Sequence, residues 1–111
     1  MAKYVSTYYS RLISDTFTYN GQFATEWARR RVSRVLGLLG KTRKRSLILD
    51  SGCGIGTFSA ILSKQAFMVG IDFSKEALRA AKFVVNHYGK KSTTELVRCD
   101  VQHLPFQCNS F

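Results

Sequence analysis

The stretch Leu47-Ile48-Leu49-Asp50-Ser51-Gly52-Cys53-Gly54-Ile55-Gly56 decides the fold. Its apolar start is typical of a β-strand buried on both faces. An aspartate stands where the strand should end, and glycine then occupies every second position. Glycine can adopt positive φ and, lacking a Cβ, lets the backbone lie close to a ligand. Because residues 57–64 have helical apolar spacing, the stretch predicts a strand, a glycine turn and a helix start. This is the nucleotide-binding corner of a doubly wound α/β fold.

The spacing of the glycines narrows the type of nucleotide site. A dinucleotide-binding fingerprint requires glycine three residues after Gly54, where this chain has Thr57. A P-loop requires Gly-Lys-Ser/Thr at the end of a longer loop, and the sequence has no such segment. The pattern that remains is Asp50-x-Gly52-x-Gly54-x-Gly56.

Two further short apolar segments also end in an acidic residue. Residues 67–72 predict a second buried strand that ends in Asp72, and residues 95–100 predict a third that ends in Asp100. A carboxylate about 20 positions after the glycine turn can accept both ribose hydroxyls of an adenosine. Any one of these aspartates could be a helix cap or a turn residue. Together, at one edge of a sheet, they favour a nucleoside site.

These motifs resemble motif I and the neighbouring motifs of the class I S-adenosylmethionine (SAM) methyltransferases. The segment Asp100-x-x-x-Leu104-Pro105-Phe106 is similar to one common in their small-molecule branch. The resemblance covers most of residues 46–111 and implies an α/β, Rossmann-like, doubly wound sheet. It also implies that the sheet is incomplete, with strand order 3-2-1, because a fourth strand would follow this segment.

The resemblance also implies ten SAM-binding residues. They are Asp50, Gly52, Cys53, Gly54, Gly56, Thr57, Asp72, Phe73, Asp100 and Val101. The glycine turn would pass close to the methionine part of SAM, and the helix N-terminus near Thr57 would favour its carboxylate. Asp50 would support the amino end.

The adenosine part of SAM would contact the ends of the second and third strands. By the same resemblance, Asp72 would hold the ribose, and Phe73 would lie beside the adenine ring. Asp100 and the backbone of Val101 would recognise the adenine edge. Methyl transfer is an in-line displacement that mainly requires positioning of donor and acceptor, so no catalytic residue is assigned.

Residues 1–45 predict an N-terminal helical segment, with one helix over 5–14 and a second that Thr25 caps and Gly40 ends. In the second helix we expect the arginines to face outward. The side chains expected to face inward are Trp27, Ala28, Val32, Val35, Leu36 and Leu39. These two helices either cover one face of the sheet or form a lid over the cofactor. A further helix should run from the N-cap Ser74 to Tyr88 and stop at Gly89.

The net charge of +10 is concentrated in residues 29–45, which hold eight basic residues and no acid. They are Arg29, Arg30, Arg31, Arg34, Lys41, Arg43, Lys44 and Arg45. A patch of this kind attracts nucleic acid or anionic lipid. Lys41 to Arg45 precede the first strand, however, and so should lie at the edge of the sheet opposite the three aspartates. We therefore expect only weak, non-specific binding of nucleic acid.

The remaining features indicate an ordinary cytoplasmic protein without a metal. The three cysteines, Cys53, Cys99 and Cys108, are odd in number and widely spaced, which is typical of reduced thiols. With His103, two of them match no zinc module. No signal peptide or membrane-spanning run is evident.

The sequence therefore predicts a SAM-dependent methyltransferase that acts on a small-molecule acceptor, with residues 46–111 as its SAM-binding half. Two alternatives stay open. The first is an RNA methyltransferase, and the second is a truncated chain that only binds SAM or a partner. An incomplete sheet would also leave the strand at Leu47–Leu49 with an unpaired edge, through which chains could associate.

Overall fold

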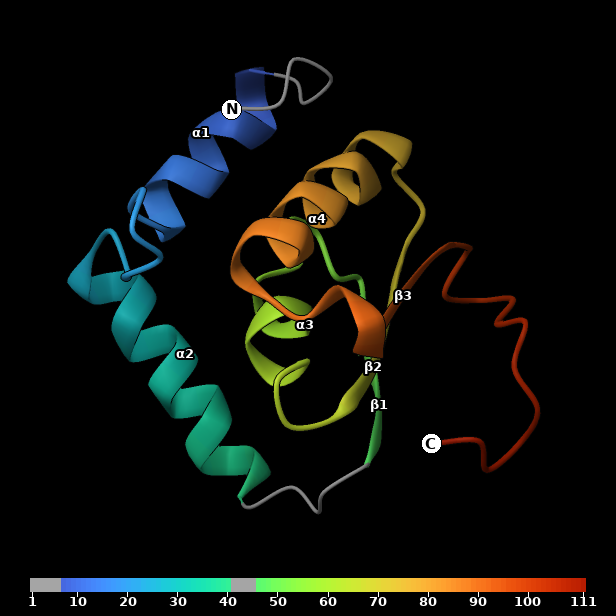
Figure 1. Cartoon of the computed structure of the whole chain (residues 1–111). Helices are drawn as coiled ribbons and strands as arrows, with labels where there is room; N and C mark the ends of the chain where they lie inside the picture. Colours follow the sequence, from blue (N-terminus) through green and yellow to red (C-terminus); the bar gives the residue numbers. More distant parts are fainter. Residues whose placement is uncertain (1–6, 41–45) are drawn as a thin grey trace.

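The computed structural model describes residues 7–40 and 46–111, and it has helices and strands in the predicted alternation (Figure 1). The helices and strands are α1 (Thr7–Thr16), α2 (Glu26–Leu39), β1 (Leu47–Ser51), α3 (Thr57–Leu62), β2 (Phe67–Asp72), α4 (Lys75–Tyr88), the short 3₁₀ helix η1 (Lys91–Thr93) and β3 (Thr94–Arg98). The third strand ends two residues earlier than predicted. The first helix extends to Thr16 rather than Ser14, and its predicted start at residues 5–6 lies outside the described residues, as does the basic segment 41–45.

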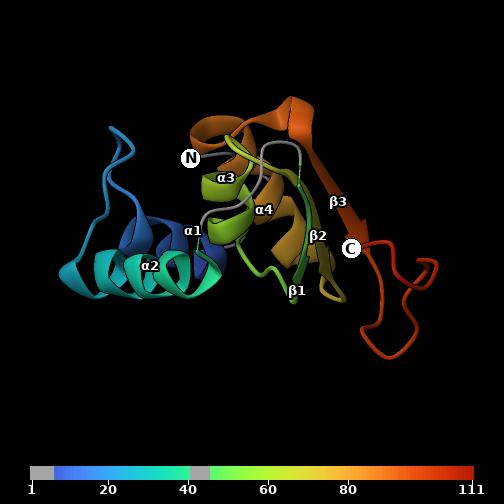
Figure 2. The ribbon, with the colours of Figure 1, turned by 90° about the horizontal axis from the view of Figure 1, so that it is seen from below.

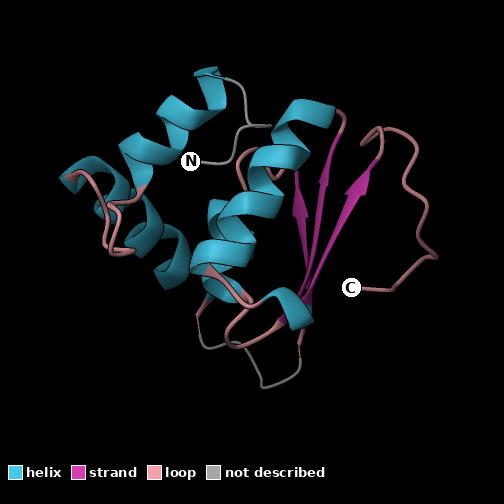
Figure 3. Cartoon of the chain, turned by 45° about the horizontal axis from the view of Figure 1, so that its top comes forward, coloured by secondary structure: helices cyan, strands magenta, loops and turns pink. Residues whose placement is uncertain are grey.

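The three strands form one parallel sheet in the predicted order 3-2-1. Helices α1 to α4 lie on one side of this sheet, and the segment after β3 lies on the other (Figures 1 and 3). The described part of the chain is therefore half of a doubly wound fold, with helices on one face only. Figure 2 shows α3 and α4 against the sheet and α1 and α2 as an outer layer.

The prediction that β1 is buried on both faces is wrong. β1 is an edge strand, because it pairs only with β2 among the described strands. Its Leu47 lies opposite Phe67 in the register, and each of these two side chains is 44% exposed. On the other face of the sheet, Ile48 and Met68 pack against Leu62 of α3. The helix-covered face of the sheet therefore supplies most of the core around β1, although Ile71 of β2, on the same face as Phe67, is also fully buried.

Small residues bring α3 and α4 close together. A Cβ on Gly56 would lie 3.0 Å from the Cβ of Ala81, and a Cβ on Gly89 would lie 2.7 Å from the Cα of Ala60. Both alanines are fully buried. This close packing holds α3, which has only six residues, directly behind the glycine turn.

Contacts between α1 and α4 fix the N-terminal helices to the rest of the molecule. The rings of Phe17 and Tyr88 stack with centroids 4.4 Å apart, and the Tyr88 hydroxyl donates a hydrogen bond to the Thr18 carbonyl. Ile13 of α1 is buried in the same cluster as Val84 of α4. α1 is therefore anchored through α4, whereas Leu36 of α2 packs against the cluster of Leu62, Ala66 and Met68.

Candidate functional site

The glycine turn leaves open space along its backbone. Gly52 and Gly54 have φ of 67° and 54°, and a Cβ on either would have no atom within 4 Å. Gly56, with φ of 79°, differs because a Cβ there would meet Ala81. The first two glycines thus give a ligand access to bare backbone, and the third allows the helix behind the turn to pack closely.

Hydrogen bonds to β2 hold this turn in place. The Cys53 amide donates to the Ile71 carbonyl at 2.8 Å, and the Gly54 amide donates to Asp72 Oδ2 at 3.0 Å. Burial, reinforced by the negative charges of Asp50 and Asp72, raises the pKa of the Cys53 thiol to about 12. Cys53 therefore stays a neutral thiol and acts as part of the wall of the site.

Asp50 lies within β1 rather than at its end, and its side chain reaches toward α3. Ser59 donates a hydrogen bond from Oγ to Asp50 Oδ2 at 2.7 Å. Burial raises the pKa of Asp50, whereas this hydrogen bond and the positive charge of Arg31 act in the opposite direction. The sequence predicted Asp50 but not Ser59, whose only signal was its place in the first turn of the helix after the glycines.

Asp72 joins three parts of the site. Its Oδ2 accepts from the Gly54 amide, and its Oδ1 accepts from the Ser74 amide at 2.8 Å. The Ser74 hydroxyl caps α4 and also lies 3.4 Å from the Tyr9 hydroxyl of α1. Each carboxylate oxygen accepts more than one hydrogen bond, so Asp72 can still accept two ribose hydroxyls.

The predicted adenine contacts lie on an open surface at the same edge of the sheet. Phe73 is 67% exposed, and the guanidinium carbon of Arg98 lies 5.5 Å from its ring centroid. Asp100 Oδ1 accepts from the Gln102 amide at 2.9 Å, which is a local turn contact. Val101 is 53% exposed. The structure thus places Phe73 directly after Asp72, and the Cys99 amide donates to the Asp72 carbonyl at 3.2 Å, but Phe73, Asp100 and Val101 do not line the enclosed part of the site.

The enclosed part is a pocket of about 680 Å³ between the glycine turn and the N-terminal helices. Its walls come from α1, the first half of α2, the end of β1, the glycine turn and the start of α3. Asp50, Cys53 and Thr57 line it on one side, and Tyr8 and Tyr9 line it on the other. Its size lies within the range of ordinary small-molecule sites. Because α1 and α2 form one wall of this pocket, the lid interpretation fits better than simple cover of the sheet.

The predicted orientation of α2 was partly wrong. Ala28 and Val32 are buried as expected, but Trp27 is 71% exposed and lies at the pocket. Arg31, which was expected to face away, also lines the pocket. The i, i+4 spacing of Trp27 and Arg31 puts them on one helix face, and this was the signal available in the sequence.

The described residues fit the chemistry of SAM. Two carboxylates lie near the bare glycine backbone: Asp72 accepts a hydrogen bond from the Gly54 amide, and Asp50 lines the same pocket as Gly52 and Gly54. Among residues 7–40 and 46–111, no group of three His, Cys, Asp or Glu side chains could hold a metal ion. In the same part of the chain, every helix is too short or too polar to cross a bilayer.

A parallel β-α-β-α-β unit with a glycine turn after its first strand defines the class of Rossmann-like, nucleoside-binding domains. Residues 48–111 match the family described as methyltransferase domain. This match covers more than half of the chain, and the protein therefore belongs to that family. Comparison with curated proteins gave no match.

Solved structures agree with this fold. The PH0226 protein of Pyrococcus horikoshii OT3 is 27% identical with a TM-score of 0.62, over 91% of this chain and 46% of that one. A putative S-adenosyl-L-methionine-dependent methyltransferase (mmp1179) of Methanococcus maripaludis is 20% identical with a TM-score of 0.63, over 96% and 47%. Phosphoethanolamine N-methyltransferase 1 of Haemonchus contortus, in complex with phosphoethanolamine and S-adenosylhomocysteine, is 21% identical with a TM-score of 0.58, over 88% and 21%. The chain therefore spans less than half the length of each of these proteins.

Proposed function

We propose that this chain binds SAM along the glycine turn and forms the cofactor-binding half of an enzyme that methylates a small molecule. The observation that carries the proposal is the open backbone at Gly52 and Gly54, with the carboxylates of Asp50 and Asp72 close to it. When bound, SAM supplies an activated methyl group. The residues of this chain bind and orient it.

The ten predicted residues divide between the two ends of the proposed cofactor. Asp50, the glycine turn and Thr57 would contact the methionine part inside the pocket. Asp72 would accept the ribose hydroxyls, and Phe73 and residues 100–101 would form a ledge for the adenine. In this proposal α1 and α2 form a lid that keeps water away from the methyl group. A cytoplasmic location is supported by the cysteines, all three of which are free.

Titration calorimetry with SAM and S-adenosylhomocysteine, carried out on a folded form of the chain, tests the proposal directly, with NADH as a control ligand. We expect binding of both adenosine ligands and none of NADH. Asp72→Ala should weaken binding at least about tenfold, because it removes a charged hydrogen-bond acceptor. Glu95→Ala, on the exposed face of β3, is the matched control and should bind like the wild type. Binding of NADH but not of SAM would overturn the proposal.

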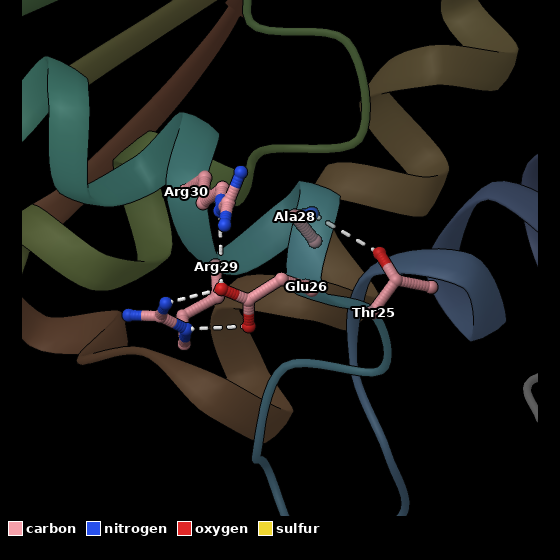
Figure 4. Close-up of polar contacts among 5 residues, drawn as sticks. All are labelled: Thr25, Glu26, Ala28, Arg29 and Arg30. Carbon is pink, nitrogen blue, oxygen red and sulfur yellow. Dashed lines mark hydrogen bonds and ion pairs between the residues drawn. The ribbon is translucent and has the colours of Figure 1, made fainter.

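The second candidate, an RNA methyltransferase, rests on the concentration of basic residues. Two of these, Arg29 and Arg30, form ion pairs with Glu26 of the same helix (Figure 4). Their charge is therefore partly compensated, and we propose only weak, non-specific binding. In the same titrations, a short RNA should bind weakly at low salt and not at physiological salt, since phosphate contacts release counterions. Sequence-selective binding that persists at physiological salt would favour the RNA enzyme.

A further inference from the structure

We propose that Arg31 binds the carboxylate of the amino-acid part of SAM, while Asp50 binds its ammonium group. The pocket would then recognise a zwitterion through one cation and one anion of its own. This inference rests on the proposed function and deepens it, because it adds a specificity-determining residue that the sequence patterns did not indicate.

Aromatic rings hold the Arg31 side chain at the pocket. Its guanidinium carbon lies 5.7 Å from the ring centroid of Trp27 on α2 and 5.2 Å from that of Phe58 on α3. All three residues line the pocket together with Asp50. Aromatic rings attract a guanidinium without accepting its N–H groups in ordinary hydrogen bonds, which leaves those groups as donors for a ligand. Arg31 is thus positioned by two elements and still able to bind an anion.

Of the four arginines of α2, Arg29 and Arg30 pair with Glu26 and Arg34 does not line the pocket, which leaves Arg31 as the one suited to a ligand. Glu26 accepts hydrogen bonds from both Arg29 and Arg30, and the bond from Arg29 Nε measures 2.8 Å (Figure 4). Among the described residues, Arg31 forms no ion pair. Its charge nevertheless acts on Asp50, since it opposes the rise in pKa that burial causes. The two opposite charges therefore share the pocket without direct contact.

The helix behind the turn is a weak anion site, so a full positive charge in the pocket would strengthen recognition of the carboxylate. The sequence suggested the N-terminus of this helix, near Thr57, for the carboxylate. α3 has only six residues, so few peptide dipoles add at its N-terminus. An arginine instead offers two parallel N–H donors that match the two oxygens of a carboxylate. Recognition of the carboxylate is therefore assigned to Arg31.

Two ligands that differ only in the carboxylate test this assignment. Dissociation constants of SAM and decarboxylated SAM are measured by calorimetry for the wild type and for Arg31→Met, which keeps much of the side-chain volume. For SAM we expect a loss of at least about tenfold, as for other charged hydrogen bonds. For decarboxylated SAM we expect a change below about twofold. Arg34→Met, one turn further along α2 and away from the pocket, should leave both constants unchanged.

The other outcomes separate this inference from the proposed function. If the wild type binds SAM but Arg31→Met weakens both ligands equally, Arg31 only shapes the pocket and the assignment is wrong. An unchanged SAM constant in Arg31→Met also overturns it while the proposed function stands. Absence of SAM binding by the wild type overturns both. Arg31→Lys should bind SAM more tightly than Arg31→Met but less tightly than the wild type. Lysine keeps the positive charge but lacks the two parallel N–H donors of arginine.

Discussion

Asp50 and Cys53 lie three positions apart in the wall of one pocket, and burial raises the pKa of both side chains. The position of Asp50 was predictable, because an acid before alternating glycines forms a recognisable pattern. Its environment was not predictable, because Ser59 of α3 hydrogen-bonds to it and the charge of Arg31 acts on it from α2. The place of Arg31 at the pocket was not predictable either. In the sequence it is one of several basic residues in a row, and only the packing of α2 against α3 brings it to the pocket.

The raised pKa of Asp50 predicts how SAM binding depends on pH. The carboxylate, not the acid, attracts an ammonium group, so affinity should fall as pH drops below the raised pKa, by up to about tenfold per pH unit. Asp50→Asn should bind SAM at least about tenfold more weakly at pH 7 and should lose this dependence. Calorimetry between about pH 7 and pH 4 checks both. Parallel pH profiles of the variant and the wild type would show that Asp50 does not contact the ligand.

The raised pKa of Asp50 should affect the stability of the fold in the opposite direction: stability falls as pH rises, whereas SAM affinity increases. A carboxyl group whose pKa is raised by folding stabilises the folded state at low pH, and this contribution is lost as pH rises through the raised pKa. Asp50→Asn should therefore melt no lower than the wild type at pH 7, although it binds SAM less well. A variant that keeps its melting temperature but binds SAM more weakly has lost a contact to the ligand and not its fold.

At the scale of elements, local sequence signals placed most helix ends correctly. The Thr25 and Ser74 side chains each accept a hydrogen bond from the amide three residues further on, as the cap predictions required. Gly40, with φ of 66°, ends α2 in the expected way. Gly89 also ends its helix, but for a different reason. Its φ is −116°, which any residue can adopt, and it must be glycine because the Ala60 backbone leaves no room for a Cβ.

Two glycine-to-alanine substitutions in the same protein should have opposite effects. Gly37 lies inside α2, and a Cβ added there would have no atom within 4 Å, so Gly37→Ala should stabilise the protein by about 0.5–1 kcal/mol. Gly89→Ala would force Ala60 to move and should destabilise it by about 1–3 kcal/mol. Chemical denaturation of both variants measures the two changes. Equal effects would mean that α3 and α4 are packed less closely than described.

At the scale of the whole molecule, the order of the strands in the sheet was predictable from the sequence. The set of elements that line the pocket was not. Strand order followed from the family pattern, because each βαβ unit adds a strand in a fixed direction. The pocket depends on how α1 and α2 dock, and that docking depends on pairs such as Phe17 and Tyr88, which are 71 positions apart. Contacts between residues so far apart in the chain leave no periodic pattern in the sequence. The sequence therefore left the lid as one of two alternatives, and the proposal of a lid rests on the α1 and α2 residues that line the pocket.

The exposed edge and face of the sheet predict that the 111-residue chain associates. Leu47 and Phe67 are register partners that are each 44% exposed, and β1 has an unpaired edge among the described strands. Such a surface favours contact between copies. We expect the chain, when expressed alone, to be oligomeric, aggregated or molten. Light scattering coupled to size-exclusion chromatography measures the state.

A matched pair of lysine substitutions locates the surface responsible for association. Leu47→Lys places a charge on the edge strand and should shift the chain toward monomer, because burying that charge between copies is costly. Leu38→Lys changes an apolar residue that is 84% exposed on α2, and it should leave association unchanged. If the wild-type chain is instead a monodisperse monomer that melts cooperatively and turns over labelled SAM, the exposed sheet surface has no need of a partner and the prediction is wrong.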